Sequence, residues 1–441
     1  MDVKVHKLLK QDNMSIDKDR ISKLPDTILF IILSFLTMKD VVATSIVSTK
    51  WRYLWQSVPS LDFSNYTRSM NAVDKVLFFR DTLSNITKFS LLCNSEWDGY
   101  RVNAWISVVV MHKLQELILT IRIKESSILP PSLFSCESLT VLKLLYDGVV
   151  RVPSSISLPS LKILELKYIH FADGHLTENF SSCPVLEELI ISNCRWVNIS
   201  RKLFISNPAL KRLVIECPNL DEGIVDFIMI EAPSLVFFRF ASRYLPIECN
   251  MSVMSSLASA SVIIQQCYQD KPKEEIGLVA SNILGALSNV KYLKISAQIL
   301  SRAKDFSDNF PEFGNLLDLE VDKGCDYMTT SSLLLLPQVS PHLETILFKG
   351  PYLHYGTEEE NWTLNLVPHL CLLHLKKVEY CDFAGDSVEI VLVKYLVENA
   401  TVLEEIIIHV NWELSKGRKC RVFEQLLKAR RASNRCIIDI R

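Results

Sequence analysis

A leucine-rich triplet that returns through most of the chain is the feature that most limits its fold. The triplet has the form L-x-x-L-x-L, and it recurs from residue 86 onward at steps of between 22 and 33 residues. Self-similarity at such a period indicates a repeat architecture, in which each unit buries its apolar face against its neighbours. The thirteen triplets are Ile86/Phe89/Leu91, Leu114/Leu117/Leu119, Leu139/Leu142/Leu144, Leu161/Leu164/Leu166, Leu186/Leu189/Ile191, Leu210/Leu213/Ile215, Leu235/Phe238/Phe240, Leu257/Ala260/Val262, Val290/Leu293/Ile295, Leu316/Leu319/Val321, Leu343/Ile346/Phe348, Leu375/Val378/Tyr380 and Leu403/Ile406/Ile408.

Each triplet predicts one short strand. The fourth and sixth residues point inward from the strand, and the first turns into the core from the preceding bend. Segments between triplets, such as 179–184, 204–209 and 229–234, each contain a proline and are expected to supply a helical turn and the bend back to the next strand. The pattern therefore predicts an α/β repeat solenoid, a leucine-rich-repeat horseshoe with a parallel sheet on its concave face. The Asn or Cys expected nine positions into each unit is clear only at Cys194.

The first sixty residues follow a different, helical pattern. Leu24 to Leu36 opens with Pro25 and Asp26, which suit a first helical turn. Its apolar residues form one stripe, while Phe30, Ile31 and Phe35 lie off that stripe, so the helix is apolar on more than one side. Thr37 to Asp40 has the form of a capping box and predicts a second helix over 41–47, and a third is expected from Ser48.

Three short helices with this much apolar surface imply a partner that covers part of it. The alternative is a helical cap that packs only within the chain, and periodicity alone does not exclude it.

The segment 19–63 resembles the F-box of plant F-box/leucine-rich-repeat proteins along its whole length. The resemblance rests on the Leu24-Pro25 pair, the run 32–36, Lys39-Asp40, Ser48 and the ending Trp51-Arg52-x-Leu54-Trp55. One departure is Thr37-Met38, where the family commonly has Pro-Thr, so a looser bend between the first two helices is expected.

The C-terminal end resembles the FBD domain of the same plant family. Trp362, the segments 367–380 and 385–410, and the closing segment 426–440 follow its pattern. The residues predict a helix that ends near Asn399, a strand containing Ile406 and Ile408, a second helix around Leu426 and a last strand over 436–440. We expect this module to seal the open edge of the solenoid, because exposed strand edges invite aggregation. The expected domains are a flexible tail at 1–18, an F-box at 19–63, the repeat solenoid at 64–360 and an FBD module that continues and caps the solenoid at 361–441.

The resemblance implies a substrate receptor of an SCF-type ubiquitin ligase, in which the F-box docks on a Skp-type adaptor that connects to a cullin and a RING subunit. The chain would then be non-catalytic and would bring a protein target to the ligase. Some of the implied adaptor-facing residues must instead pack the F-box internally, and the sequence does not sort them. The implied residues are Leu24, Pro25, Ile28, Leu29, Ile32, Leu33, Leu36, Val41, Val42, Val47, Trp51, Leu54 and Trp55.

The target is expected on the concave sheet, because the residues between the inward leucines point outward there. In successive triplets this position holds Ile118, Lys143, Glu165, Ile190, Val214, Arg239, Ser261, Lys294, Glu320, Leu347, Glu379 and Ile407. The charged members, Lys143, Glu165, Arg239, Lys294, Glu320 and Glu379, are the candidate target-binding residues.

Two alternatives to the ligase receptor stay open. Some related receptors bind a small hormone over an inositol phosphate, which needs converging Lys and Arg residues. The residues predicted to point outward from the concave sheet include no such cluster, so a protein target is favoured over a small-molecule-gated co-receptor. The other alternative is a repeat scaffold whose F-box is vestigial.

Composition argues against other classes of protein. Lys+Arg 48 against Asp+Glu 50 gives a formal charge of -2, without the basic stripe that nucleic-acid binding requires. The sequence contains no HExxH, GxSxG, P-loop or GxGxxG motif, and no Cys/His cluster at zinc spacing, so no enzyme activity, cofactor or metal site is expected. The N-terminus lacks the apolar stretch of a secretory signal, and no stretch approaches the length of a membrane span. Twelve scattered cysteines fit reduced thiols, so the nucleus, the cytoplasm or both are the expected location.

Overall fold

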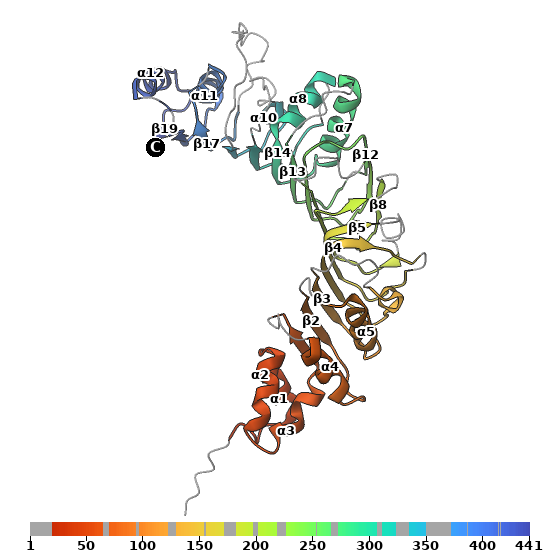
Figure 1. The fold of residues 1–441 in the computed structure, drawn as a ribbon. Helices are drawn as coiled ribbons and strands as arrows, with labels where there is room; N and C mark the ends of the chain where they lie inside the picture. The colour runs from red at the N-terminus through yellow and green to blue at the C-terminus, as the bar shows by residue number, and fades with distance from the viewer. Residues whose placement is uncertain are drawn as a thin grey trace, which may run out of the picture.

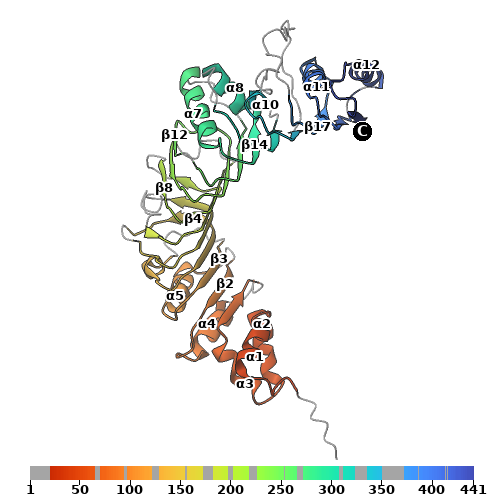
Figure 2. The same cartoon turned by 180° about the vertical axis from the view of Figure 1, so that it is seen from behind.

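The computed structural model describes residues 20–64, 70–93, 97–121, 129–153, 156–171, 182–196, 202–217, 226–252, 254–265, 272–306, 311–322, 335–349, 372–385, 387–412, 414 and 416–441. Parallel strands line the inner side of a long arc, with the N-terminal helices at one end and the C-terminal module at the other (Figure 1). The view from behind shows the same order of parts along the arc (Figure 2).

One parallel sheet runs through the whole molecule. Within the described residues it has 16 strands, and its main path follows chain order except where β8, β10 and β12 leave it. The short strand β7 (Arg195–Trp196) pairs with β5 off that path. The strands of the path are β1 (Ser60–Phe63), β2 (Lys88–Cys93), β3 (Glu116–Ile121), β4 (Val141–Val150), β5 (Ile163–Phe171), β6 (Glu188–Ser192), β9 (Arg212–Cys217), β11 (Phe237–Ser242), β13 (Ser259–Ile264), β14 (Tyr292–Ser296), β15 (Asp318–Asp322), β16 (Thr345–Lys349), β17 (Lys377–Phe383), β18 (Glu405–Val410) and β19 (Ile437–Ile440).

The core confirms the triplet pattern. Every residue of the thirteen triplets is buried, because a strand of period two places its fourth and sixth positions on one face and that face is covered by the outer layer. Cys194 is buried as well, and its Sγ lies 3.4 Å from the carbonyl oxygen of Leu166 on the neighbouring turn. A leucine-rich-repeat fold with a long parallel sheet is therefore confirmed.

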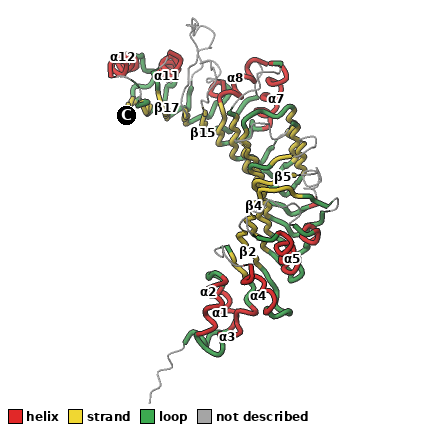
Figure 3. Tube along the Cα trace, viewed as in Figure 1, coloured by secondary structure: helices red, strands yellow, loops and turns green. Residues whose placement is uncertain are grey.

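Helices form the outer layer at both ends of the arc, as the colouring by secondary structure shows (Figure 3). They are α4 (Met70–Phe79), α5 (Gly99–Val110), the 3₁₀ turn η3 (Pro131–Ser135), α7 (Lys273–Ala286), α8 (Ala297–Phe306), α10 (Leu335–Gln338), α11 (Ser387–Asn399) and α12 (Lys416–Leu427).

The middle of the outer layer corrects one prediction. Helical turns were expected at 204–209 and 229–234, but these segments start within strands β8 (Lys202–Ser206) and β10 (Phe227–Glu231). Strand β10 pairs in parallel with β8 on one side and with β12 (Glu248–Met251) on the other. The reason is an alternation of period two: Leu203 and Ile205 are buried between exposed or half-buried neighbours, and β10 repeats the pattern. The first half of the third such segment, 179–181, lies outside the described residues.

Residues 20–57 form three short helical units. These are α1 (Asp26–Leu33), α2 (Met38–Ala43) continued by the 3₁₀ turn η1 (Thr44–Ile46), and α3 (Trp51–Leu54) continued by the 3₁₀ turn η2 (Trp55–Ser57). The second helix begins earlier than predicted, directly after Thr37. The Thr37 hydroxyl donates to the carboxylate of Asp40 at 2.7 Å and does not accept from a backbone N–H, so the capping box is not formed. Helix α2 packs against β1, and the apolar core continues from these helices into the repeats.

The C-terminal module extends the sheet. Helix α11 ends at Asn399 and α12 contains Leu426, as predicted, and strands β17 to β19 continue the solenoid's register. We expected this module to seal the open edge, but within the described residues β19 pairs with β18 alone and remains the terminal strand. Strand β19 is only four residues long, and it carries the charged Asp439 beside Arg441. Short length and charge both limit the pairing of an exposed edge strand with other chains.

Candidate adaptor and target surfaces

Helix α1 is apolar on two opposite faces, of which only one is covered. Leu29 and Leu33 are 0% and 1% exposed and pack into the core. Ile31, on the opposite side of α1, and Phe35, in the turn just after α1, are 55% and 83% exposed. Because an isolated protein gains nothing from exposing large apolar side chains together, this second face has the character of a binding surface.

The exposed apolar side chains continue from α1 onto the second and third helical units. Ile28, Ile32 and Leu36 are exposed on or just after α1, Ile46 and Val47 follow α2, and Tyr53 lies on α3. We refer to these residues together with Ile31 and Phe35 as the F-box apolar surface: Ile28, Ile31, Ile32, Phe35, Leu36, Ile46, Val47 and Tyr53.

The structure sorts the thirteen residues that the sequence implied as adaptor-facing. Five pack inside the helical unit: Leu29, Leu33, Val41, Trp51 and Leu54. Eight remain exposed or half-buried: Leu24, Pro25, Ile28, Ile32, Leu36, Val42, Val47 and Trp55. The sequence analysis did not single out Ile46 or Tyr53. Ile31 and Phe35 were visible as residues off the main stripe.

Polar contacts fix the start of α1 against α3. The indole N–H of Trp51 donates to the hydroxyl of Ser22 at 2.8 Å, and that hydroxyl lies 3.1 Å from the hydroxyl of Ser48. Lys50 donates to the carbonyl of Leu24 at 2.7 Å and pairs with Asp26 at 3.0 Å. These bonds fix the Leu24-Pro25 turn against α3. The helices that carry the F-box apolar surface are therefore held in a defined arrangement by polar contacts as well as by the core.

The concave sheet carries the second candidate surface. Strand register places the twelve residues predicted between the inward leucines beside one another, from Ile118 paired with Lys143 to Glu379 paired with Ile407. We call these twelve the concave row: Ile118, Lys143, Glu165, Ile190, Val214, Arg239, Ser261, Lys294, Glu320, Leu347, Glu379 and Ile407.

Charges in the first half of the concave row pair with neighbours on the same sheet face. Lys143 lies 3.1 Å from Glu165 on the next strand, and Lys167 reaches the other oxygen of the same carboxylate at 2.5 Å. Burial opposes the charge of Glu165, but the hydrogen bonds from the two lysines outweigh it and hold the pKa of this carboxyl below its ordinary value. Arg239 pairs with Glu216 on the adjacent strand.

The second half of the concave row is paired in the same way. Lys294 donates to Glu320 at 2.7 Å, and Glu379 lies 3.2 Å from a ring nitrogen of His409. All six charged residues predicted for target binding therefore have a partner of opposite charge or a histidine. The row alternates such pairs with aliphatic members, including Ile190, Val214 and Leu347.

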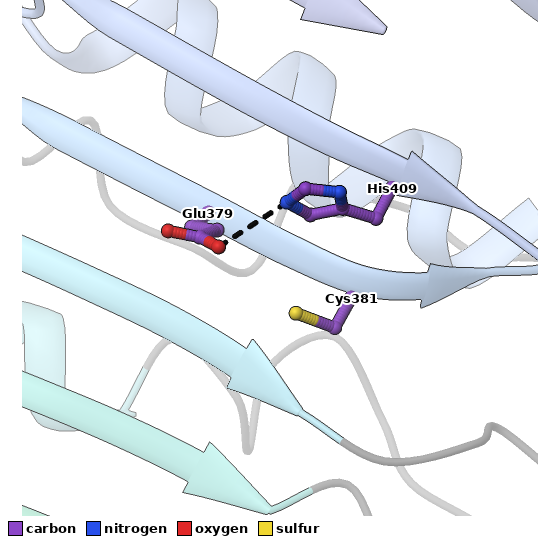
Figure 4. A group of neighbouring side chains, drawn as sticks. All are labelled: Glu379, Cys381 and His409. Atoms are coloured by element: carbon purple, nitrogen blue, oxygen red, sulfur yellow. Dashed lines mark hydrogen bonds and ion pairs between the residues drawn. The ribbon is translucent and has the colours of Figure 1, made fainter. Parts of the chain in front are cut away.

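A group of three potential metal ligands was not apparent from local spacing. Glu379 and Cys381 of β17 and His409 of β18 each offer a ligand atom, and these atoms all lie within 4.8 Å of one another (Figure 4). Cys381 and His409 occupy the position directly after the last triplet residue in their repeats. Aligning the repeats, and not searching for a contiguous motif, is the signal that would have found them.

No helix in the described part of the chain is long and apolar enough to cross a membrane.

Comparison with known proteins adds the family. An F-box domain model matches residues 21–63, a model of the LRR repeats of FBD-associated F-box protein At5g56370 matches 102–277, and an FBD model matches 365–408. F-box/LRR-repeat protein 13 of Arabidopsis thaliana is 31% identical over 417 residues, which cover 88% of this chain and 89% of that protein. The chain belongs to the F-box/FBD/LRR-repeat family. F-box/LRR-repeat protein At4g14103 of Arabidopsis thaliana is 30% identical over 361 residues (77% of this chain, 93% of that protein). A putative F-box/FBD/LRR-repeat protein of the same plant, At3g59240, is 29% identical over 464 residues (96% and 89%).

The matched domains correspond to structural parts described above. The F-box is the three-helix unit with the apolar surface, and the FBD match begins before β17 and ends within β18. The triplets extend on both sides of the matched repeat segment, since β2 precedes residue 102 and β14 to β16 follow residue 277.

Proposed function

We propose that this protein is the substrate-recognition subunit of an SCF-type E3 ubiquitin ligase. Its F-box binds a Skp-type adaptor, and through it a cullin and RING core, while the concave face of the repeats binds a protein target. The chain itself is non-catalytic and supplies proximity. The F-box family generally consists of such receptors, which supports the proposal.

The observation that carries the proposal is the F-box apolar surface. Ile31 stands exposed on α1 opposite the buried Leu29 and Leu33, and Phe35 stands exposed just after the end of that helix. A stable protein interface buries on the order of 1,200–2,000 Å² in total, and aromatic or large aliphatic anchors contribute most of its binding energy. Phe35 and Ile46 are the most exposed large apolar side chains of the unit and would be such anchors.

The concave row favours a protein target over a small ligand. Its charges are already paired with neighbours, so they form polar contacts at the rim of an interface without presenting a cluster of converging cations. An apolar cavity within the core of the repeats is lined by Leu142, Leu164, Phe171 and similar side chains together with Cys183. It lacks the placed polar groups that orient a bound small molecule.

Co-expression with a plant Skp-type adaptor tests the proposal. We expect the full chain and the adaptor to co-elute in size-exclusion chromatography, and the double variant Ile31→Asp/Phe35→Asp to elute alone. Met111→Asp is the matched control, because the side chain of Met111 is as exposed as that of Phe35 but follows α5, outside the F-box. Circular dichroism melting confirms that each variant is folded. Absence of a complex with wild type, or a complex kept by the double variant, contradicts the proposal and leaves a repeat scaffold with a vestigial F-box.

A further inference from the structure

Three side chains with metal-binding chemistry meet on the concave face of the FBD region. Glu379 and Cys381 are two residues apart on β17, so both point to the same side of the sheet, away from the buried Val378 and Tyr380. Strand pairing sets Tyr380 opposite Ile408, which places His409 beside Cys381. Figure 4 shows the three side chains gathered along the two neighbouring strands.

The pairing of β17 with β18 is irregular beside these three residues. Pairing resumes between Phe383 and Val410, so β17 has one residue more than β18 after the Tyr380 pair, and Cys381 and Asp382 together stand opposite His409. Asp382 takes a positive φ of 53°, which lets the strand absorb the extra residue. A bulge of this kind re-aims side chains, and bulges are frequent beside functional sites.

The polar contacts already align two of the ligands. One carboxylate oxygen of Glu379 lies 3.2 Å from Nε2 of His409, and the other lies 3.9 Å from the ammonium group of Lys377. Lys377 in turn lies 3.7 Å from Glu405 on β18. One carboxylate oxygen of Glu379 therefore lies toward His409 and near Cys381, while the second oxygen lies toward the ammonium group of Lys377.

We propose that Glu379, Cys381 and His409 form a zinc site with three protein ligands and an open fourth position. Zinc takes thiolate, imidazole and carboxylate ligands at about 2.0–2.3 Å in tetrahedral geometry, which places ligand atoms about 3.3–3.8 Å apart. The three atoms, all within 4.8 Å, reach that geometry by side-chain rotation. Mg²⁺ and Ca²⁺ are disfavoured because they take oxygen ligands, and the set here has one sulfur and one nitrogen.

Binding balances charge and protons at the site. Zn²⁺ displaces the proton of the Cys381 thiol, which leaves to solvent, and the thiolate and the Glu379 carboxylate together neutralise the ion. The fourth position opens to the concave face, because the three residues are half-buried on that side. In the isolated protein a water molecule would complete the coordination, and a donor from a bound partner could replace it. This inference does not depend on adaptor binding.

Metal titration of the full, untagged chain tests the site. After chelation and dialysis, we add Zn²⁺ to one sample and measure bound metal by elemental mass spectrometry, and we add Co²⁺ to a separate metal-free sample and follow the absorption of a cobalt–thiolate bond. We expect about one equivalent of metal, the cobalt–thiolate absorption, and a melting temperature that rises with Zn²⁺. In Cys381→Ser the absorption disappears, and in His409→Ala the affinity falls by more than the roughly 10–100-fold that loss of an outer contact costs.

Cys420→Ser is the matched control, because Cys420 is an exposed thiol on α12 outside the cluster. It should keep both the stoichiometry and the absorption. Metal-free melting of each variant separates loss of the site from loss of the fold. An absorption that survives in Cys381→Ser, or a wild-type chain that retains no Zn²⁺ and gives no cobalt–thiolate band, overturns the proposal.

Discussion

Lys294 of β14 donates a hydrogen bond of 2.7 Å to Glu320 of β15, whose carboxylate is one of the few charged groups buried in the sheet. The hydroxyl of Tyr292 also donates to this carboxylate, at 2.8 Å, and Lys349 of β16 lies 3.2 Å away. Burial opposes the charge of Glu320, but these donors outweigh it and hold its pKa below the ordinary value. Burial, with the bond to Glu320, raises the pKa of Tyr292 to about 12, so the phenol stays a donor at neutral pH. One carboxylate thus ties together three strands of the concave face.

Glu320→Gln should lower the free energy of unfolding by about 1–3 kcal/mol at pH 7, because hydrogen bonds to a charged group are lost. The folded-state pKa of Glu320 lies below its unfolded value of about 4.3. Its stabilisation is therefore complete above that pH and is lost as pH falls through the folded pKa. Urea unfolding followed by circular dichroism should show a constant gap between wild type and variant from pH 7 to about 5, and a narrower gap below about 4.3. A gap that is absent at pH 7 would count against the network.

The buried thiols should be unreactive in the folded chain. Burial raises the pKa of Cys93, Cys194 and Cys249 to about 12 each, whereas Cys420 is exposed on α12. Because the thiolate is the nucleophile, we expect alkylation at pH 8 to be at least about 100-fold faster at Cys420 than at Cys194 or Cys249. Pulsed iodoacetamide labelling with peptide mass spectrometry measures this, and urea should make the rates similar. Similar rates in the folded protein would mean that the core is open to solvent.

Glu389 should be a structural carboxyl of the C-terminal module. It is fully buried at the start of α11 and accepts hydrogen bonds from the backbone N–H groups of Ala384 and Gly385, at 2.8 Å each, and from the hydroxyl of Tyr380 at 3.0 Å. Glu389→Ala removes the acceptor of these three buried hydrogen bonds and should destabilise the protein by about 2–5 kcal/mol. Glu398→Ala, on the exposed side of the same helix, should change stability by less than about 0.5 kcal/mol. Equal effects in urea unfolding would refute the role of Glu389.

Gly385 beside this carboxyl should not tolerate a side chain. Its φ is +71°, and an added Cβ would lie 3.1 Å from Cγ2 of Val422 on α12. Gly385→Ala is therefore expected to destabilise the protein by about 1–3 kcal/mol through backbone strain and contact with α12. Gly417→Ala is the control, because a Cβ there meets no atom within 4 Å. Thermal melting compares the two, and an unchanged melting temperature for Gly385→Ala would contradict the expectation.

The repeat pattern predicted the sheet more closely than the outer layer. The constant offset within each triplet fixes which residues face the core, and equal offsets in neighbouring repeats set Lys143 beside Glu165 and Lys294 beside Glu320. The outer segments are short, and their prolines favoured helical turns. The alternation of Leu203 and Ile205 in β8 was the competing signal, and tertiary pairing with β10 decided in its favour.

The candidate surfaces were only partly readable from sequence. Helical spacing groups Leu29 and Ile28 as neighbours on one stripe, yet the packing of the three helices buries the first and exposes the second. Which residues of a helix become buried depends on how the helices cross, and the sequence pattern of one helix does not determine the crossing. The approach of His409 to Glu379 likewise depends on the pairing of β17 with β18 across 30 positions of sequence.

The affinity of the full chain for a Skp-type adaptor tests the central claim most directly. Isothermal titration calorimetry should give a tight complex for wild type, and Ile31→Ala/Phe35→Ala should weaken it at least about 100-fold, because exposed anchors of this kind contribute about 1–4 kcal/mol each. Tyr100→Ala, an exposed aromatic residue on α5, should bind as wild type does. An affinity that is unchanged in the double variant while the protein stays folded would contradict the claim that the F-box apolar surface is the docking site.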